Sequence, residues 1–241
     1  MIEKTHGIVL HGFAYGETSL IVRIFTRKLG LQSFIIKGVR KKKARIHHNL
    51  FQPLNLLELV VNHKERGGLQ HSREISIWHP FQSIPLNMHK TAVAMFLAEL
   101  LGKVLKEQDP QPGLFDFCTR TIRWFDQQSD NTADFHLVFM VRMTEFLGFM
   151  PQNNHSPRYT YFNLAEGQFQ PGNTPQHACL EAEESRALSQ LCLLQPEESG
   201  SLHFSLPLRR KLLAALVNYY RFHLEGMSGL RSLPILESIM Q

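Results

Sequence analysis

Short apolar runs with alternating polar positions fill the first 80 residues of the chain. The runs are rich in β-branched, leucine and aromatic residues, and breaks such as Tyr15-Gly16-Glu17 and Arg66-Gly67-Gly68 separate them. Runs of this length between turn residues predict β-strands. The predicted strands are residues 6–15, 19–26, 31–37, 55–62 and 69–78. Five strands in so short a segment predict a small closed sheet, a five-stranded β-barrel.

The second predicted strand indicates what the two faces of the sheet do. Leu20, Val22 and Ile24 occupy alternate positions, and side chains alternate between the faces of a strand. The positions between and after them are cationic or aromatic, namely Arg23, Phe25 and Arg27. One face is therefore expected to build a core and the other to be cationic and aromatic. Phe25 and Phe34 are candidate stacking platforms, although we favour the core for Phe34.

The hydrophobic pattern takes a helical period after His79-Pro80. Helices are predicted over residues 91–106, 112–125, 133–147, 207–224 and 232–240, the third ending at Gly148 with Pro151 beyond it. Residues 149–180 are rich in Asn, Gln, Pro and Gly and predict a loop with a short hairpin. The expected fold class is α+β, with a β-barrel domain at 1–80 and a helical domain at 81–241.

Positive charge is concentrated in the first third of the chain. Residues 1–80 carry 13 Lys and Arg against 5 Asp and Glu, whereas residues 81–241 carry 13 against 16. Such asymmetry predicts an N-terminal region that meets polyanions, attached to a body with a different task.

The densest positive charge directly follows the third predicted strand. This basic segment contains Lys37, Arg40, Lys41, Lys42, Lys43 and Arg45, and His47-His48 come next. An exposed loop that contacts phosphates explains such a run, and Arg23, Arg27 and Lys28 could border the same surface. A solvated loop that serves only solubility is the alternative. Adjacent histidines on a strand point to opposite sides, so a metal site at His47 and His48 is not expected.

Several other classes of protein find no support in the sequence. No apolar stretch is long enough to span a bilayer and no secretion signal is recognisable, so a cytoplasmic protein is expected. The three cysteines predict reduced, mostly buried thiols rather than disulfides. Motifs for phosphate loops, serine hydrolases and zinc proteases are missing, and Asp126, Asp130 and Asp134 are assigned to helix ends and caps.

Several stretches together resemble the bacterial DNA repair family RecO. They are residues 7–22 (GIVLHGFAYGETSLIV), Phe25-Thr26, Leu29-Gly30, residues 36–40 (IKGVR), residues 146–151 (FLGFMP) and residues 230–236 (LRSLPIL). The resemblance spans nearly the whole chain and rests on the order and spacing of these stretches.

The resemblance implies an OB-fold barrel joined to a helical domain, with no enzymatic activity. It implies binding of single- and double-stranded DNA and annealing of complementary strands. It also implies cooperation with RecR, and in some bacteria RecF, in loading RecA onto DNA coated by single-strand-binding protein. A location at the bacterial nucleoid follows from such a role.

Two features of the C-terminal half bear on this resemblance. Arg209-Arg210-Lys211 lie in the first turn of the helix predicted from Pro207, and the resemblance makes them candidates for binding the acidic, Phe-ending tail of single-strand-binding protein. An exposed turn paired with Glu197 or Glu198 is the alternative.

Some relatives carry a structural zinc on two cysteine pairs. At those places this chain has His155 and Arg158, then His177 and Cys179, so no zinc or other cofactor is expected. The loop is expected to pack its aromatic residues inward instead, namely Tyr159, Tyr161, Phe162 and Phe169.

Two functions of other classes stay open at this point. A metal-dependent nuclease would use His47, His48 and scattered carboxylates. A protein-interaction adaptor would use the basic segment to meet an acidic protein and would bind little DNA.

Overall fold

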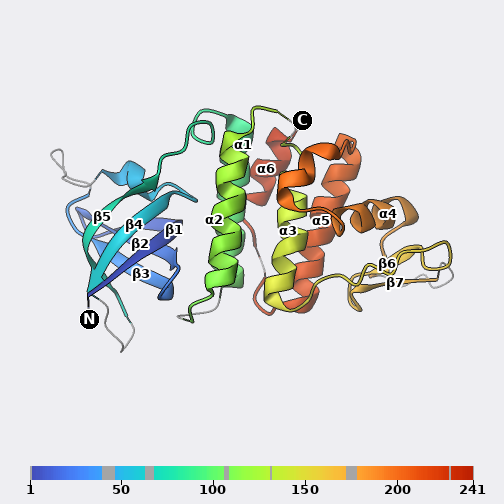
Figure 1. Cartoon of the computed structure of the whole chain (residues 1–241), viewed down its shortest axis with the longest axis horizontal. Coiled ribbons are helices and arrows are strands. Elements are labelled where there is room, and N and C mark those ends of the chain that lie inside the picture. The colour runs from blue at the N-terminus through green and yellow to red at the C-terminus, as the bar shows by residue number, and fades with distance from the viewer. Residues whose placement is uncertain are drawn as a thin grey trace. The chain divides into compact units, whose positions relative to one another are not determined.

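The computed structural model describes residues 2–39, 47–62, 68–105, 109–130, 132–171, 178–227 and 229–240 (Figure 1). The chain divides into two compact units. The first contains residues 1–126 and 230–236, and the second contains residues 127–229 and 237–241. The predicted domain boundary at residue 80 stays a prediction.

The first unit is built on a five-stranded antiparallel sheet. Its strand order is β3-β2-β1-β4-β5. The strands are β1 (Ile2–Tyr15), β2 (Ser19–Thr26), β3 (Gly30–Ile36), β4 (Leu56–Asn62) and β5 (His71–His79). All five predicted strands are confirmed.

The sheet is not a fully closed barrel, which corrects the expectation of a closed sheet. Among the residues that the structure describes, its two edges are hydrogen-bonded to each other only at Gln70, whose amide donates to Ser33 O at 2.8 Å and whose carbonyl accepts from the Ile35 amide at 3.1 Å. The bulges where β5 pairs with β4 shift its register. The sheet therefore keeps two edge strands, β3 and β5, and one isolated bridge, between Phe34 and Gln70, joins the two edges among the described residues.

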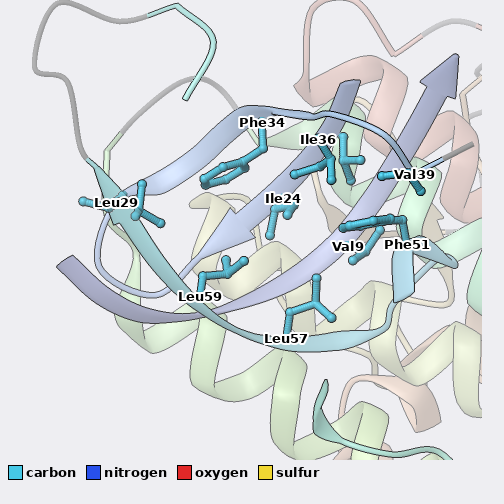
Figure 2. Close-up of a cluster of buried hydrophobic side chains, with 11 residues drawn as sticks. Val9, Ile24, Leu29, Phe34, Ile36, Val39, Phe51, Leu57 and Leu59 are labelled. Carbon is cyan, nitrogen blue, oxygen red and sulfur yellow. The ribbon is translucent and has the colours of Figure 1, made fainter. Parts of the chain in front are cut away.

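The core of the sheet contains residues from every strand except β5, with the partly buried Ile75 of β5 packed against it (Figure 2). Phe34 is fully buried there, as expected. Val39 and Phe51, which lie on either side of the basic segment, belong to the same cluster. The short 3-10 helix η1 (His48–Phe51) thus ends on the core.

Gly7 of β1 marks a close approach inside the core. A Cβ atom there would lie 2.5 Å from Ile24 Cγ2 and 2.9 Å from Leu59 Cδ1. The neighbouring side chains therefore occupy the space that any larger residue would need. At Gly12 of the same strand a Cβ would meet only Val22 Cγ2, at 3.7 Å, which is ordinary contact.

Helices cover part of the other face of the sheet. Phe25 is 1% exposed, and its ring meets Phe115 edge to face at 5.5 Å, so it is not an open stacking platform. The covering helices are α1 (Met88–Val104) and α2 (Pro112–Gln127). The cationic and aromatic face of β2 is thus partly covered by helices, which the sequence did not predict because alternation along a strand does not reveal which element packs against each face.

A buried polar network joins the start of α1 to the end of α2. Asp126 accepts hydrogen bonds from the backbone amides of Gln82, Ser83 and Ile84 at 2.8 to 2.9 Å. Lys90 donates to Ser83 Oγ at 2.6 Å and to the Phe125 carbonyl at 2.8 Å. Asp126 at the end of α2 is therefore a structural anchor for the preceding loop.

A second carboxylate fixes the segment that returns to this unit near the C-terminus. Glu99 of α1 accepts from the Arg231 amide at 2.9 Å and from the amide and hydroxyl of Ser232 at 2.8 and 2.5 Å. Burial favours a higher pKa for Glu99, but the Ser232 hydroxyl, the two amides and Lys103 outweigh it, and the pKa lies below its ordinary value of 4.5. The carboxylate is therefore held in its charged form.

The second unit contains helices and one small hairpin. Its elements are α3 (Phe135–Leu147), β6 (Tyr161–Asn163), β7 (Gln168–Gln170), α4 (Ala182–Leu191), the 3-10 helix η2 (Pro196–Ser201) and α5 (Leu206–His223), and α6 (Leu233–Ile239) spans the division. Gly148 closes α3 with φ of 83°, as predicted. The predicted hairpin is confirmed, with Phe162 and Phe169 buried and Tyr159 and Tyr161 half-buried.

Two further observations complete the fold. The predicted helices correspond to α1, α2, α3, α5 and α6, and α4 was not predicted. Over the described ranges no helix is long and apolar enough to cross a membrane.

Candidate nucleic-acid interface

Strand register sorts the predicted DNA-binding residues of the first unit into two groups. Leu20 pairs with Ile36 at one end of the β2–β3 ladder, and Thr26 pairs with Gly30 at the other. Lys37 therefore lies at the end that carries the β1–β2 turn, whereas Arg27 and Lys28 lie at the opposite end. The ladder between them spans six residue steps, which is roughly 20 Å.

The end that carries Lys37 is named here the basic end. Lys37, His47 and His48 are exposed there. The predicted contacts Arg40, Lys41, Lys42, Lys43 and Arg45 lie outside the described residues, between Val39 and His47. Because Val39 and Phe51 are both packed in the core, the chain on each side of the basic segment is anchored at this end of the sheet.

The basic end also carries aromatic residues that the sequence reading did not single out. Alternate positions at the end of β1, next to the β1–β2 turn, carry His11, Phe13 and Tyr15, and all three are exposed. The sequence does contain a signal for this row, because three ring-bearing residues stand two positions apart directly before a turn that contains Gly16. In the sequence they belong to the strand predicted over residues 6–15 and to the stretch 7–22 that resembles the RecO family.

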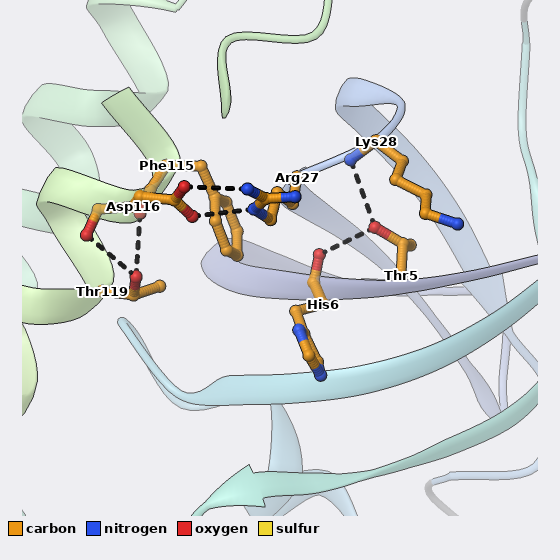
Figure 3. A network of polar contacts seen from close by, with 7 residues as sticks. All are labelled: Thr5, His6, Arg27, Lys28, Phe115, Asp116 and Thr119. Atoms are coloured by element: carbon orange, nitrogen blue, oxygen red, sulfur yellow. Dashed lines mark hydrogen bonds and ion pairs between the residues drawn. The ribbon is translucent and has the colours of Figure 1, made fainter. Parts of the chain in front are cut away.

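The cations at the opposite end are engaged within the first unit (Figure 3). Arg27 donates from Nε and an amino nitrogen to the two carboxylate oxygens of Asp116 in α2, at 2.8 and 2.9 Å. This hydrogen bonding lowers the pKa of Asp116 and raises that of Arg27. Lys28 pairs with Glu3 at 3.2 Å.

Arg23 occupies the middle of β2 and also has a partner in the helices. Its guanidinium donates to the Gly102 carbonyl at the end of α1, at 3.4 Å. Arg27 and Lys28 thus lie at the other end of the ladder from Lys37, whereas the half-buried Arg23 pairs across the ladder with His11 of β1. Their assignment to DNA binding stays a prediction, and it is weaker than that of the basic end.

Two family models cover almost all of the chain. Residues 1–81 match the model described as Recombination protein O N terminal, and residues 85–234 match Recombination protein O C terminal. The chain belongs to the RecO family. The α+β class and the five-stranded OB-type sheet that the resemblance implied are thereby confirmed.

Individual members of the RecO family are similar over their full length. DNA repair protein RecO of Phocaeicola vulgatus is 33% identical over 239 residues, with 99% of each chain covered. The proteins of the same name from Bacteroides fragilis and Flavobacterium johnsoniae are each 34% identical, with 99% and 98% of both chains covered. The chain accordingly has a role in DNA repair and recombination, and none of these names assigns a catalytic activity.

Each of the three cations predicted to bind a partner's tail contacts a different acceptor within the second unit. Arg209 is 7% exposed and donates from Nε to Asp134 Oδ1 at 2.8 Å and from an amino nitrogen to the Phe204 carbonyl at 3.0 Å. Arg210 donates to the Glu237 carbonyl at 3.1 Å, and Lys211 pairs with Glu184 at 2.7 Å. The expected convergence of the three on one anion is not seen.

Asp134 also differs from its predicted role. It stands at the N-cap position of α3, but its side chain makes no capping hydrogen bond and binds Arg209 instead. Ser205 caps α5, accepting from the Leu208 amide at 3.4 Å. Arg209 is thus part of the internal structure of the helical unit.

A pocket of about 440 Å³ lies in the second unit, and one of its lining residues is Phe204, whose carbonyl accepts from Arg209. Its lining is mostly apolar and comes from the end of α4 and the segment before α5, namely Gln190, Leu193, Leu194, Ser201, Leu202, His203 and Phe204. Leu193 is 70% exposed at its rim. Arg142 approaches from α3 and donates to the Leu194 carbonyl at 2.6 Å.

Three of the positions that correspond to the zinc ligands of some relatives, His155, Arg158 and Cys179, are among the described residues. The His155 ring packs edge to face on the Phe169 ring, with ring centroids 5.1 Å apart, and the backbone of Cys179 forms an isolated antiparallel β-bridge with Asn163. His177 lies outside the described residues. Among the residues that are described, no group of three or more His, Cys, Asp or Glu could hold a metal ion.

Proposed function

We propose that this RecO-family chain binds single- and double-stranded DNA at the basic end of its N-terminal sheet. Binding there would promote annealing of complementary strands and, together with RecR, help load RecA onto DNA coated by single-strand-binding protein. RecF is a further candidate partner, and the cytoplasm near the nucleoid is the expected location. The observation that carries the proposal is the burial of Val39 and Phe51 in the core, on either side of the most basic stretch of the sequence.

The physical basis is electrostatic. Each Lys or Arg that neutralises a phosphate releases condensed counterions, and this release supplies affinity without regard to base sequence. A Lys-rich segment contacts phosphates rather than base edges, so we expect little sequence preference. The same neutralisation lowers the repulsion between two complementary strands, which favours their annealing.

Annealing of two dye-labelled complementary oligonucleotides tests this proposal. The variant K41E/K42E/K43E should anneal them no faster than the spontaneous rate, whereas wild type accelerates annealing. A matched control with the same charge change, R123E/R186E/R231E, alters three exposed residues on other elements and should anneal as wild type does. Equal annealing by wild type and K41E/K42E/K43E would contradict the proposal.

For the acidic tail of single-strand-binding protein we propose the pocket that contains Phe204, with Arg210 and Lys211 as exposed cations whose present partners are the Glu237 carbonyl and Glu184. The pocket supplies an apolar recess for a terminal Phe, and Lys211 is 54% exposed at its side chain. The double variant R210A/K211A keeps the buried Arg209 in place and should weaken binding of a fluorescent tail peptide. The variant L193D should do the same from the apolar side, and unchanged affinity in both rules the pocket out.

A further inference from the structure

The last third of β1 carries a row of exposed rings. A bulge between Val9 and His11 shifts the register of β1 against β2. Beyond the bulge Gly12 pairs with Val22, a core residue, so the alternate positions His11, Phe13 and Tyr15 face away from the core. Phe13 is 44% exposed and Tyr15 is 51% exposed.

Two rings of this row lie side by side along the strand. His11 and Phe13 have ring centroids 6.0 Å apart with an angle of 28° between their planes. Tyr15 is the next alternate residue, and its backbone lies roughly 6.6 Å further along the strand. A row of exposed rings on one strand is a feature that marks interaction surfaces, and a function at this surface accounts for it.

The charge beside the row indicates the kind of partner. Lys37 lies at this same end of the sheet, the other cations of the basic segment follow it in the sequence, and His11 adds a protonatable ring. Glu17 in the β1–β2 turn is an exposed acid here and opposes phosphate binding, so the row itself is suited to bases more than to the backbone. Rings next to cations are the combination by which proteins hold single strands, because bases stack on rings while phosphates meet the cations.

We propose that His11, Phe13 and Tyr15 form a stacking platform for the bases of single-stranded nucleic acid. The platform rests on the proposed DNA-binding function and adds a distinction to it. In a duplex the faces of the bases are covered by their neighbours, so the platform contributes to binding of a single strand and not of a duplex. The basic segment serves both forms.

Binding of matched single- and double-stranded oligonucleotides by F13A/Y15A tests this platform. Each ring lost should weaken single-strand binding by at least about fivefold, the lower end of the effect of one base–ring contact. Duplex affinity and its salt dependence should stay as in wild type. The conservative variant F13Y/Y15F should bind as wild type does, and I77A on β5 serves as a control that removes another exposed apolar side chain.

An abasic strand of the same length separates stacking from phosphate contact. Wild type should bind the abasic strand about as weakly as F13A/Y15A binds the normal one. Equal losses for single strand and duplex, no loss for either, or a change of oligomeric state in F13A/Y15A on sedimentation would each overturn the platform. Failure of wild type to bind any DNA would instead overturn the proposed function.

Discussion

The buried ion pair between Asp134 and Arg209 is expected to be a major support of the helical unit. Only 3% of the Asp134 side chain and 8% of the Arg209 side chain are exposed. Asp134→Ala removes the carboxylate and leaves the guanidinium's charge in the interior. Removing one partner of a buried pair costs about 3 to 5 kcal/mol, mostly because the other charge stays desolvated. This is a large part of the roughly 5 to 15 kcal/mol by which a domain is usually stable.

Urea unfolding followed by circular dichroism at 222 nm measures this loss. Both tryptophans, Trp78 and Trp124, lie in the first unit, so their fluorescence would not report on the second. The double variant D134L/R209M removes both charges and should regain most of the stability lost in either single variant. A loss below about 1 kcal/mol in Asp134→Ala, or strict additivity in the double variant, would refute the reasoning. An Arg209 substitution that abolishes tail binding thus needs a stability measurement beside it.

Three further predictions concern packing, pH and thiol chemistry. Gly7→Ala should destabilise the first unit by about 1 to 3 kcal/mol in urea unfolding followed by tryptophan fluorescence, because its Cβ collides with core side chains, while Gly12→Ala should change stability little. Glu99→Gln should cost about 1 kcal/mol at neutral pH. Because the folded-state pKa of Glu99 lies below its ordinary 4.5, the advantage of wild type should be complete above that pH and vanish as the pH falls through the folded-state value, as thermal unfolding at several pH values would show. Iodoacetamide at pH 8 should label the half-buried Cys179 well before Cys192, whose pKa burial raises to about 12, and labelling in urea should proceed at similar rates at both.

The elements that the sequence predicted well are those with a strong local pattern. The five strands and the helices α1, α2, α3, α5 and α6 agree with their predicted positions to within a few residues because apolar periodicity and turn residues mark them. Helix α4 was missed because its sequence AEESRALSQL offers only a narrow apolar stripe, at Ala187, Leu188 and Leu191. A short polar helix of this kind takes its stability from packing on its neighbours, which local sequence does not reveal.

The partners of individual cations could not be predicted from the sequence, for a different reason. Arg27 binds a carboxylate 89 residues away, and Arg209 binds one 75 residues away. The sequence shows that a residue is charged, but the tertiary fold decides which residue it contacts. The position of the basic segment after β3 was predictable because it follows from strand order alone.

The central claim is that the basic end of the sheet binds DNA through phosphate contacts. A salt titration of single-stranded oligonucleotide binding tests it most directly, comparing wild type, K41E/K42E/K43E and the control R123E/R186E/R231E. If three phosphate contacts are lost, the plot of log K against log salt should become shallower by about 2 for a single strand in K41E/K42E/K43E, with weaker affinity at every salt concentration. The control should keep the wild-type slope. An unchanged slope and affinity in K41E/K42E/K43E would contradict the claim.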